Sequence, residues 1–314
     1  MIKKIAVVGS ILGFAFLCSI SIYLVCFVSP SLSYDIKVVW KYVSNYGSDA
    51  FPGKNGWFFY RGALRSLITP WPNENIDNIG QLNKLLLQDS IQLLVVPVPN
   101  KNEVYPDSAE LGNPQVVSNQ RNRLIQRLHN ANIHVIDLLP VFKSANQNKL
   151  FYFKHDSHWN MNGISVAVKE ISNEIHRMEP TISHSPFLKT IDTESTCYND
   201  LWKLFYNDHS NGCEGLCSWK KVILLDGRPY KGDPLAPVLI FGDSFVNAGS
   251  DVNANLFAQI AYATGISTRN YFTFMAFEEG ARKLKAYLNN TKSKPKIIVW
   301  VFVSCKLSRR FPDP

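Results

Sequence analysis

The sequence contains no internal repeat and no low-complexity tract, which argues against a repeat array or a long disordered linker. Cysteine is scarce, with 6 in 314 residues, and the charged residues are scattered rather than gathered in blocks. Core-forming residues are plentiful, since 46% of the chain is apolar and 12% is aromatic. This composition excludes an intrinsically disordered protein and supports one large globular domain or two ordinary ones.

Charge is absent from residues 5–28, which are long enough to cross a bilayer as one helix. Lys3 and Lys4 precede this stretch, so the positive-inside rule places the rest of the chain outside the cytoplasm. A cleaved signal peptide is the alternative, but the stretch is long for one and no small-x-small cleavage site follows it. We predict a membrane anchor at 1–30 in the inner membrane and an exported domain at 31–314, in the periplasm or outside the cell.

Export also decides which partners and which cysteine chemistry to expect. Leaving Lys3 and Lys4 out of the formal net charge of +8 gives +6 for residues 31–314, which suits an acidic glycan or an anionic membrane surface, whereas the topology argues against nucleic acid. Two cysteines, Cys18 and Cys26, lie in the apolar stretch, where lipid contact or helix packing is expected. An oxidising compartment favours structural disulfides among the others, with three possible connectivities, over a zinc site for which only Cys213 and Cys217 have suitable spacing. These other cysteines are Cys197, Cys213, Cys217 and Cys305.

Apolar runs of strand length alternate with helical periodicity from about residue 74 onward. An Asn55-Gly56 turn and an aromatic strand precede this region. The predicted helices cover 74–89, 117–130, 161–178, 253–263 and 278–290, and the predicted strands cover 91–98, 133–138, 238–241, 266–272 and 296–303. This alternation predicts a three-layer α/β/α domain with a mostly parallel sheet. Residues 185–235, with three cysteines and little periodicity, are interpreted as an insertion into that domain.

Three polar segments are expected at the carboxyl ends of the strands, where catalytic groups gather in such folds. Two of them, "PNKNEVYP" and "FGDSFVNAG", follow predicted strands, and "HDSHWN" precedes a predicted helix. In "FGDSFVNAG", a strand runs into Gly242 and Asp243, and a sharp turn there would expose the Ser244 hydroxyl. His158, two positions after Asp156, is the candidate base for this serine, and Asp156 would orient its ring. Taken alone, an Asp-x-His pair is more often a hydrogen-bonding or capping pair, so the triad depends on the two segments meeting.

Four stretches in this order resemble the alginate O-acetyltransferase family of the AlgX/AlgJ type, whose catalytic domain is SGNH-hydrolase-like. They are "GKNGWFFY", "VPVPNKNEVYP", "DSHWNMNG" and "GDSF", with "YNDLW" and "GARKLKAYL" as weaker echoes. The resemblance implies that Ser244 is the nucleophile, His158 its base and Asp156 the partner of His158. It also implies acetyl transfer to hydroxyls of an exported polysaccharide through an acetyl-serine, without a cofactor. The acetyl supplier would be a multi-pass membrane acyltransferase.

Two features depart from the family pattern. The C-terminal "VWVFVSCKLSRR" lacks the acidic residue and the Glu-Arg pair that often follow the strand tryptophan. The Gly-x-Asn-Asp block of ordinary SGNH enzymes is also absent, so the oxyanion donors beyond the Ser244 backbone are open, with Asn247 as one candidate.

Other candidate substrate-binding residues have equally plausible structural roles. Lys101 and Tyr105 follow a strand, where they would contact substrate, or be a solvated lysine and a packed tyrosine. Trp159 would either stack on a sugar or form the wall that holds His158, and we favour the wall. For Asn160 we favour the role of helix N-cap.

Three other functions compete with acetyl transfer. A carbohydrate O-acetylesterase would use the same triad, because only the nucleophile that resolves the acyl-enzyme differs. A metallohydrolase would use His155, Asp156 and His158 as ligands, but no further ligand has convincing spacing, and no metal is expected. A non-catalytic glycan-binding component of a secretion complex is favoured by the altered C-terminal motif.

Overall fold

The computed structural model describes residues 38–44, 47–69, 71–111, 115–145, 149–181, 188–207, 215–274, 276–277 and 279–309. The predicted membrane-spanning stretch 5–28 and Cys213 lie outside these residues. Within the described part of the chain, no helix is both long enough and apolar enough to cross a membrane.

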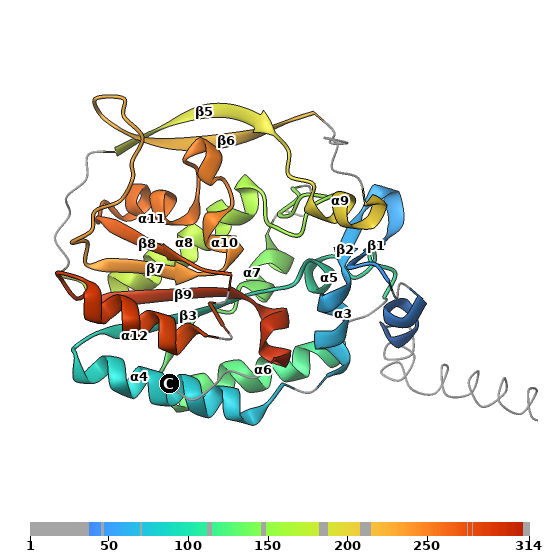
Figure 1. Ribbon diagram of the computed structural model, residues 1–314, viewed down its shortest axis with the longest axis horizontal. Helices are drawn as coiled ribbons and strands as arrows, with labels where there is room; N and C mark the ends of the chain where they lie inside the picture. The colour runs from blue at the N-terminus through green and yellow to red at the C-terminus, as the bar shows by residue number, and fades with distance from the viewer. Residues whose placement is uncertain are drawn as a thin grey trace, which may run out of the picture.

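A five-stranded, fully parallel sheet forms the centre of the molecule (Figure 1), in the order β4-β3-β9-β7-β8. Its strands are β3 (Gln92–Val98), β4 (His134–Val135), β7 (Val238–Gly242), β8 (Thr268–Phe272) and β9 (Ile297–Val303). All but the last residue of β9 are buried, as expected for a central strand covered on both faces. The carboxyl ends of β3, β7 and β9 therefore lie side by side at one edge of the sheet.

Helices cover both faces of this sheet, as the sequence predicts. One face packs against α4 (Asn73–Gln88), α6 (Gln115–Asn130) and α12 (Gly280–Asn290). The opposite face packs against α7 (Leu138–Ser144), α8 (Met161–Met178) and α11 (Leu256–Thr264). Figure 1 shows these two layers below and above the strands. The predicted three-layer arrangement is thus confirmed.

The predicted elements agree with the observed ones, except for one strand that ends earlier and one helix that begins later than predicted. The predicted strand 133–138 ends at Val135, because Asp137 accepts a hydrogen bond from Leu139 N (3.0 Å) and caps α7. The predicted helix 253–263 begins only at Leu256, because Asn253 is left-handed (φ 57°) after a short 3-10 helix η2 (Ser250–Val252).

Two smaller antiparallel pairs flank the sheet. The Asn55-Gly56 turn forms as predicted, in a 3-10 helix η1 (Lys54–Gly56) between β1 (Ala50–Pro52) and β2 (Phe58–Tyr60), and β2 leads into α3 (Arg61–Ile68). A long ribbon of β5 (Leu188–Thr196) and β6 (Leu216–Leu224) lies over α11 (Figure 1), with α9 (Asp200–Tyr206) between its strands in the sequence. The segment that the sequence presents as featureless is therefore folded against the same layer of helices.

Candidate active site

Ser244 follows the carboxyl end of β7, as predicted, and opens the four-residue helix α10 (Ser244–Asn247). Gly242 ends the strand in close contact with its neighbour, since a Cβ there would lie 2.3 Å from Val301 O and 2.5 Å from Val246 Cγ1. The glycine is therefore required by close packing against β9, and a positive φ is not the reason.

Asp243 fixes the turn that presents Ser244. One carboxylate oxygen accepts a hydrogen bond from Phe245 N (3.1 Å), and the other accepts one from Val303 N (2.9 Å). Asp243 is 3% exposed, and this burial raises the pKa of its carboxyl. Its two bonds tie the serine turn to the end of β9, so the position of Ser244 is set by the sheet.

Lys101 holds in place the loop that carries the predicted dyad. This loop closes through a bridge between Tyr152 and Trp159. The buried Lys101, on the short helix α5 (Lys101–Val104), donates hydrogen bonds from Nζ to three carbonyls, those of Phe58 (2.7 Å), Lys154 (2.6 Å) and Asp156 (2.9 Å). Burial lowers the pKa of Lys101 to about 7, and the Asp156 and Asp200 carboxylates oppose this.

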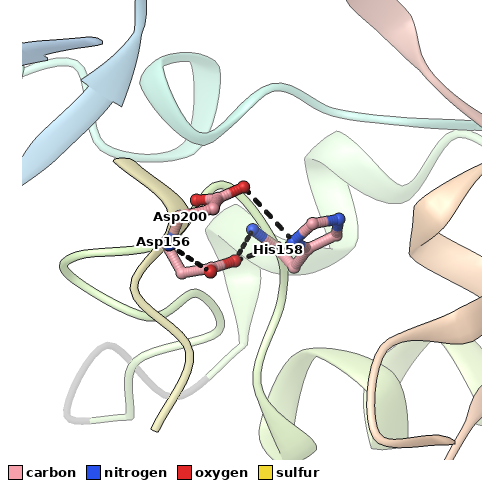
Figure 2. Close-up of side chains that lie close together, drawn as sticks. All are labelled: Asp156, His158 and Asp200. Atoms are coloured by element: carbon pink, nitrogen blue, oxygen red, sulfur yellow. Dashed lines mark hydrogen bonds and ion pairs between the residues drawn. The ribbon is translucent and has the colours of Figure 1, made fainter. Parts of the chain in front are cut away.

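Asp156 and His158 form the predicted dyad (Figure 2). Asp156 Oδ1 lies 2.7 Å from His158 Nδ1 and also accepts the His158 backbone N–H (2.9 Å). Burial alone would lower the pKa of His158, but the Asp156 carboxylate outweighs it and raises that pKa to about 9. Burial would raise the pKa of Asp156, but His158 and the N–H donors lower it to about 2. The bond at Nδ1 leaves Nε2 as the ring nitrogen available to a substrate or nucleophile.

Asp200 is a third acidic group at this site that motif reasoning did not assign. Its Oδ2 lies 3.7 Å from His158 Nδ1, and its backbone N–H donates to Asp156 Oδ2 (2.8 Å). Ser157 N donates to Asp200 Oδ1 (2.7 Å). Burial and the neighbouring Asp156 raise the pKa of Asp200 to about 6. The only sequence signal was "YNDLW", noted above as a weak echo of the family.

One cavity of about 530 Å³ brings the three predicted catalytic residues together. Asp156, His158 and Ser244 line it, and so do Asp200 and the candidate Asn247. Ser244 is half-buried, and no hydrogen bond joins its hydroxyl to His158 among the described residues. Catalytic hydrogen bonds often shorten only when substrate binds, so the shared cavity is the relevant observation.

The other candidate substrate-binding residues lie behind this cavity rather than in its wall. Tyr105 accepts a hydrogen bond from Phe151 N (2.7 Å) and packs on Trp57, with ring centroids 4.5 Å apart. Trp159 is fully buried, donates from Nε1 to Phe245 O (3.1 Å) and meets that ring edge-on. The Phe245 ring in turn lies 5.0 Å from the His158 ring.

The N-cap that the sequence predicts for α8 is present. Asn160 accepts hydrogen bonds from Asn162 N and Gly163 N and so begins the helix. Its Nδ2 also donates to Leu150 O (2.9 Å), so the whole side chain is committed to backbone groups.

The alternative metal site does not fit these contacts. Among the described residues, the group with ligand atoms within 4.8 Å of one another is Asp156, His158 and Asp200, without His155. His155 is buried against Trp202, with ring centroids 5.2 Å apart. The carboxylate oxygens of the group already accept N–H and O–H donors, which a cation would have to displace. This arrangement is that of a hydrogen-bonded dyad with a supporting carboxylate.

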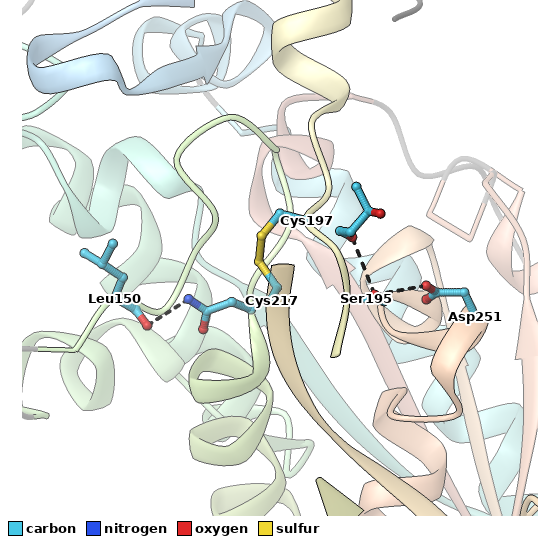
Figure 3. Close-up of a disulfide and its surroundings, with 7 residues drawn as sticks. Leu150, Ser195, Cys197, Cys217 and Asp251 are labelled. Atoms are coloured by element: carbon cyan, nitrogen blue, oxygen red, sulfur yellow. Dashed lines mark hydrogen bonds between the residues drawn. A yellow bond between two sulfur atoms is a disulfide. The ribbon is translucent and has the colours of Figure 1, made fainter. Parts of the chain in front are cut away.

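A disulfide between Cys197 and Cys217 closes the end of the β5–β6 ribbon (Figure 3), while Cys305 is buried and not disulfide-bonded. Cys197 and the adjacent Tyr198 line both the cavity at Ser244 and an adjoining cavity of about 440 Å³. Tyr198 is held by hydrogen bonds to Asp251 and from Gly249 N. One predicted structural bridge is thus present and forms part of the cavity wall. The prediction that Cys305 is also bridged is wrong, because, among the described cysteines, this one is buried and free.

A family model and a curated protein match parts of this chain. Residues 50–209 match the family described as an SGNH hydrolase-like domain, acetyltransferase AlgX. The alginate biosynthesis protein AlgX of Pseudomonas putida is 26% identical over 132 residues, which are 39% of this chain and 27% of that protein. The chain therefore matches only about a quarter of the length of this curated relative.

Solved structures share the fold at low sequence identity. The O-acetyltransferase domain of Pseudomonas putida AlgJ superposes with a TM-score of 0.66 at 20% identity, covering 84% of this chain and 94% of that one. Pseudomonas aeruginosa AlgX gives a TM-score of 0.66 at 18% identity, covering 86% and 65%, respectively. Bacillus cereus PatB1 gives 0.52 at 15% identity, covering 85% and 100%. These likenesses support an SGNH-like α/β fold.

Proposed function

The chain belongs to the family of AlgX-type acetyltransferases with an SGNH hydrolase-like domain, and from this premise we propose that it O-acetylates an exported polysaccharide. The observation that carries the proposal is that the Asp156–His158 dyad and Ser244 line the same cavity. Family membership alone does not locate the chemistry; the shared cavity supports Ser244 as the nucleophile and His158 as the base.

Acyl transfer would proceed from these side chains in two steps. Ser244 Oγ attacks the carbonyl carbon of the acetyl donor while His158 Nε2 takes its proton, and Asp156 stabilises the imidazolium. The bond to the leaving group breaks, His158 returns the proton to that group, and acetyl-Ser244 remains. A sugar hydroxyl then gives its proton to His158 and attacks the ester carbonyl carbon. The bond to Ser244 Oγ breaks, His158 returns the proton to that oxygen, and the O-acetyl sugar is released.

The buried residues around the dyad support this role by positioning rather than by substrate contact. Lys101 holds the loop that carries Asp156. Phe245, which is hydrogen-bonded to Trp159, packs against the His158 ring. Tyr105 anchors the start of the same loop at Phe151. We assign substrate contact instead to groups on the large cavity, including Asn247 and Tyr198.

Export is part of the proposal. The Cys197–Cys217 disulfide fits an oxidising compartment, and the uncharged stretch 5–28 fits a single-pass inner-membrane anchor. A domain tethered outside the cytoplasm needs its acetyl groups delivered across the membrane, so a multi-pass acyltransferase is the expected partner.

The test uses an activated acetyl ester as donor and separate polysaccharides as acceptors, with O-acetylation read by NMR. Transfer to one polysaccharide that is lost in Ser244→Ala supports the proposal. Ester turnover that depends on Ser244 but yields only acetate, whichever acceptor is offered, would instead assign an esterase.

A further inference from the structure

Ser244 lines a second, smaller cavity of about 200 Å³ on the side facing β3 and β9. Ser157 and Asp200 also line it, whereas Asp156 and His158 line only the cavity of about 530 Å³. Ser244 and Asp200 are shared by the two cavities. Sites for drug-sized ligands span roughly 300–1,000 Å³. The larger cavity is thus of a size for a sugar unit, and the smaller one only for a compact group.

Four of the polar side chains that line the smaller cavity are committed to partners. Lys101 donates to three carbonyls. Asn100 donates to Glu103 Oε2 (2.7 Å) and accepts from Cys305 N (3.1 Å). Ser157 and Asp200 are hydrogen-bonded to each other. These groups have little capacity left for a ligand.

Asn102 differs from these neighbours. It is 1% exposed and lines the smaller cavity, and both Nδ2 and Oδ1 are buried without a hydrogen-bond partner. Leaving a buried amide unsatisfied costs roughly 1–3 kcal/mol, so such a group calls for an explanation. A ligand with a carbonyl oxygen would satisfy the Nδ2 donor.

The backbone around Asn102 is held on both sides. Lys101 before it is fixed by its three carbonyl bonds, and Glu103 after it is paired with buried Arg121 (3.1 Å) and accepts from Ser304 Oγ (2.7 Å). The backbone of Asn102 is therefore fixed before any ligand arrives, and burial of its side chain restricts the amide. A donor placed in advance is what stabilising a developing oxyanion requires.

We propose that the smaller cavity is the acyl subsite and that Asn102 Nδ2 donates a hydrogen bond to the carbonyl oxygen of the acyl group on Ser244. The inference rests on the proposed acetyl-serine. It supplies a side-chain oxyanion donor from the end of β3 in a chain that lacks the Gly-x-Asn-Asp block. It also specifies the substrate class: the smaller cavity accepts short acyl groups, and the acceptor sugar binds in the cavity of about 530 Å³ that Ser244 and His158 line.

The experiment compares acylation of Ser244 by 4-nitrophenyl acetate, butyrate and octanoate in the full chain and its variants, with Tm measured in parallel. Asn102→Ser and Asn102→Ala differ at this position by one hydroxyl donor. We expect Asn102→Ala and the near-isosteric Asn102→Leu to slow acylation by acetate by about 100-fold, with Asn102→Ser intermediate. Tm should be unchanged or higher in Asn102→Leu, because a buried unsatisfied amide is removed.

Asn255→Leu is the matched control, because Asn255 Oδ1 is also buried without a partner but the residue lines neither cavity. It should leave acylation unchanged. Wild-type acylation of Ser244 with equal rates in all Asn102 variants, or equal rates for acetate and octanoate, would overturn the acyl subsite and leave the proposed function standing. No Ser244 acylation in wild type would overturn both.

Discussion

Asp156 and Asp200 both lie near His158 Nδ1, but their carboxylates accept hydrogen bonds from different residues. Asp156 contacts the ring nitrogen and the backbone of His158, whereas Asp200 is 3.7 Å from that nitrogen and holds Ser157. The Asp156–His158 pair was predictable because its two members are neighbours in the sequence. Asp200 and Asn102 were not assigned, because only folding brings them to Ser244.

The raised pKa of His158 predicts how acylation depends on pH. Acylation needs the neutral ring, and a pKa raised to about 9 keeps the ring protonated near pH 7. The rate of Ser244 acylation should therefore rise with pH through about 9. Single-turnover kinetics with an activated acetyl ester, corrected for spontaneous hydrolysis, measures this. A rate independent of pH from 6 to 10 would exclude His158 as the base.

The two carboxylates should affect this profile differently. Asp156→Asn should move the rising limb to lower pH, because the main group that raises the His158 pKa is lost, and should lower the plateau on the order of 10³–10⁴-fold through misorientation of the ring. Asp200→Asn should shift the limb in the same direction by less and keep most of the plateau. Similar plateau losses in both variants would mean that Asp200 also orients the ring.

At the scale of elements, the β7–α10 turn depends on contact between neighbouring strands. Gly242→Ala should lower both stability and acylation, because the added Cβ would lie 2.3 Å from Val301 O in β9. Overpacking of this kind costs roughly 1–3 kcal/mol. Chemical denaturation measures it. Gly80→Ala is the control: it lies in α4 with nothing within 4 Å, so it should stabilise the protein by about 0.5–1 kcal/mol. Equal effects at both positions would contradict the packing argument.

The ribbon supplies a second prediction at this scale. Cys197→Ser should destabilise the protein by about 3 kcal/mol, because the disulfide closes a loop with a sequence separation of 20. It should also weaken acetyl transfer, because the closed segment carries Tyr198 and Asp200 on the cavity wall. Denaturation with and without reductant measures the first effect. Cys305→Ala should leave the reductant effect intact, since Cys305 is not disulfide-bonded; the idea fails if wild type is insensitive to reduction.

Long elements could be predicted from the sequence because their signal is averaged over several turns or a fully apolar run. This holds for α4, α8, β3 and β9. Short elements could not, because one cap or contact decides them. Four-residue α5 and α10 carry Asn102 and Ser244, and β5 shows alternating exposure that its polar residues do not reveal.

At the scale of the whole molecule, the dyad links stability to pH. The His158 pKa is raised from 6.5, so its contribution is complete below about 6.5 and is lost as pH rises through about 9. The Asp156 pKa is lowered from 3.8, so its contribution is complete above about 3.8 and is lost as pH falls towards about 2. The Tm difference between wild type and His158→Ala should therefore be largest between about pH 3.8 and about pH 6.5, where both contributions are complete. A difference that grows above pH 9 would contradict the pairing.

The central claim, that the fold presents Ser244 as an acyl-accepting nucleophile to the Asp156–His158 dyad, is tested most directly by intact-protein mass spectrometry. Residues 31–314 would be incubated with an activated acetyl ester, quenched in acid and mapped by peptide. We expect one added acetyl group on Ser244, absent in Ser244→Ala and strongly reduced in His158→Ala. Absence of the adduct, with ester turnover no faster than in these two variants, would contradict it.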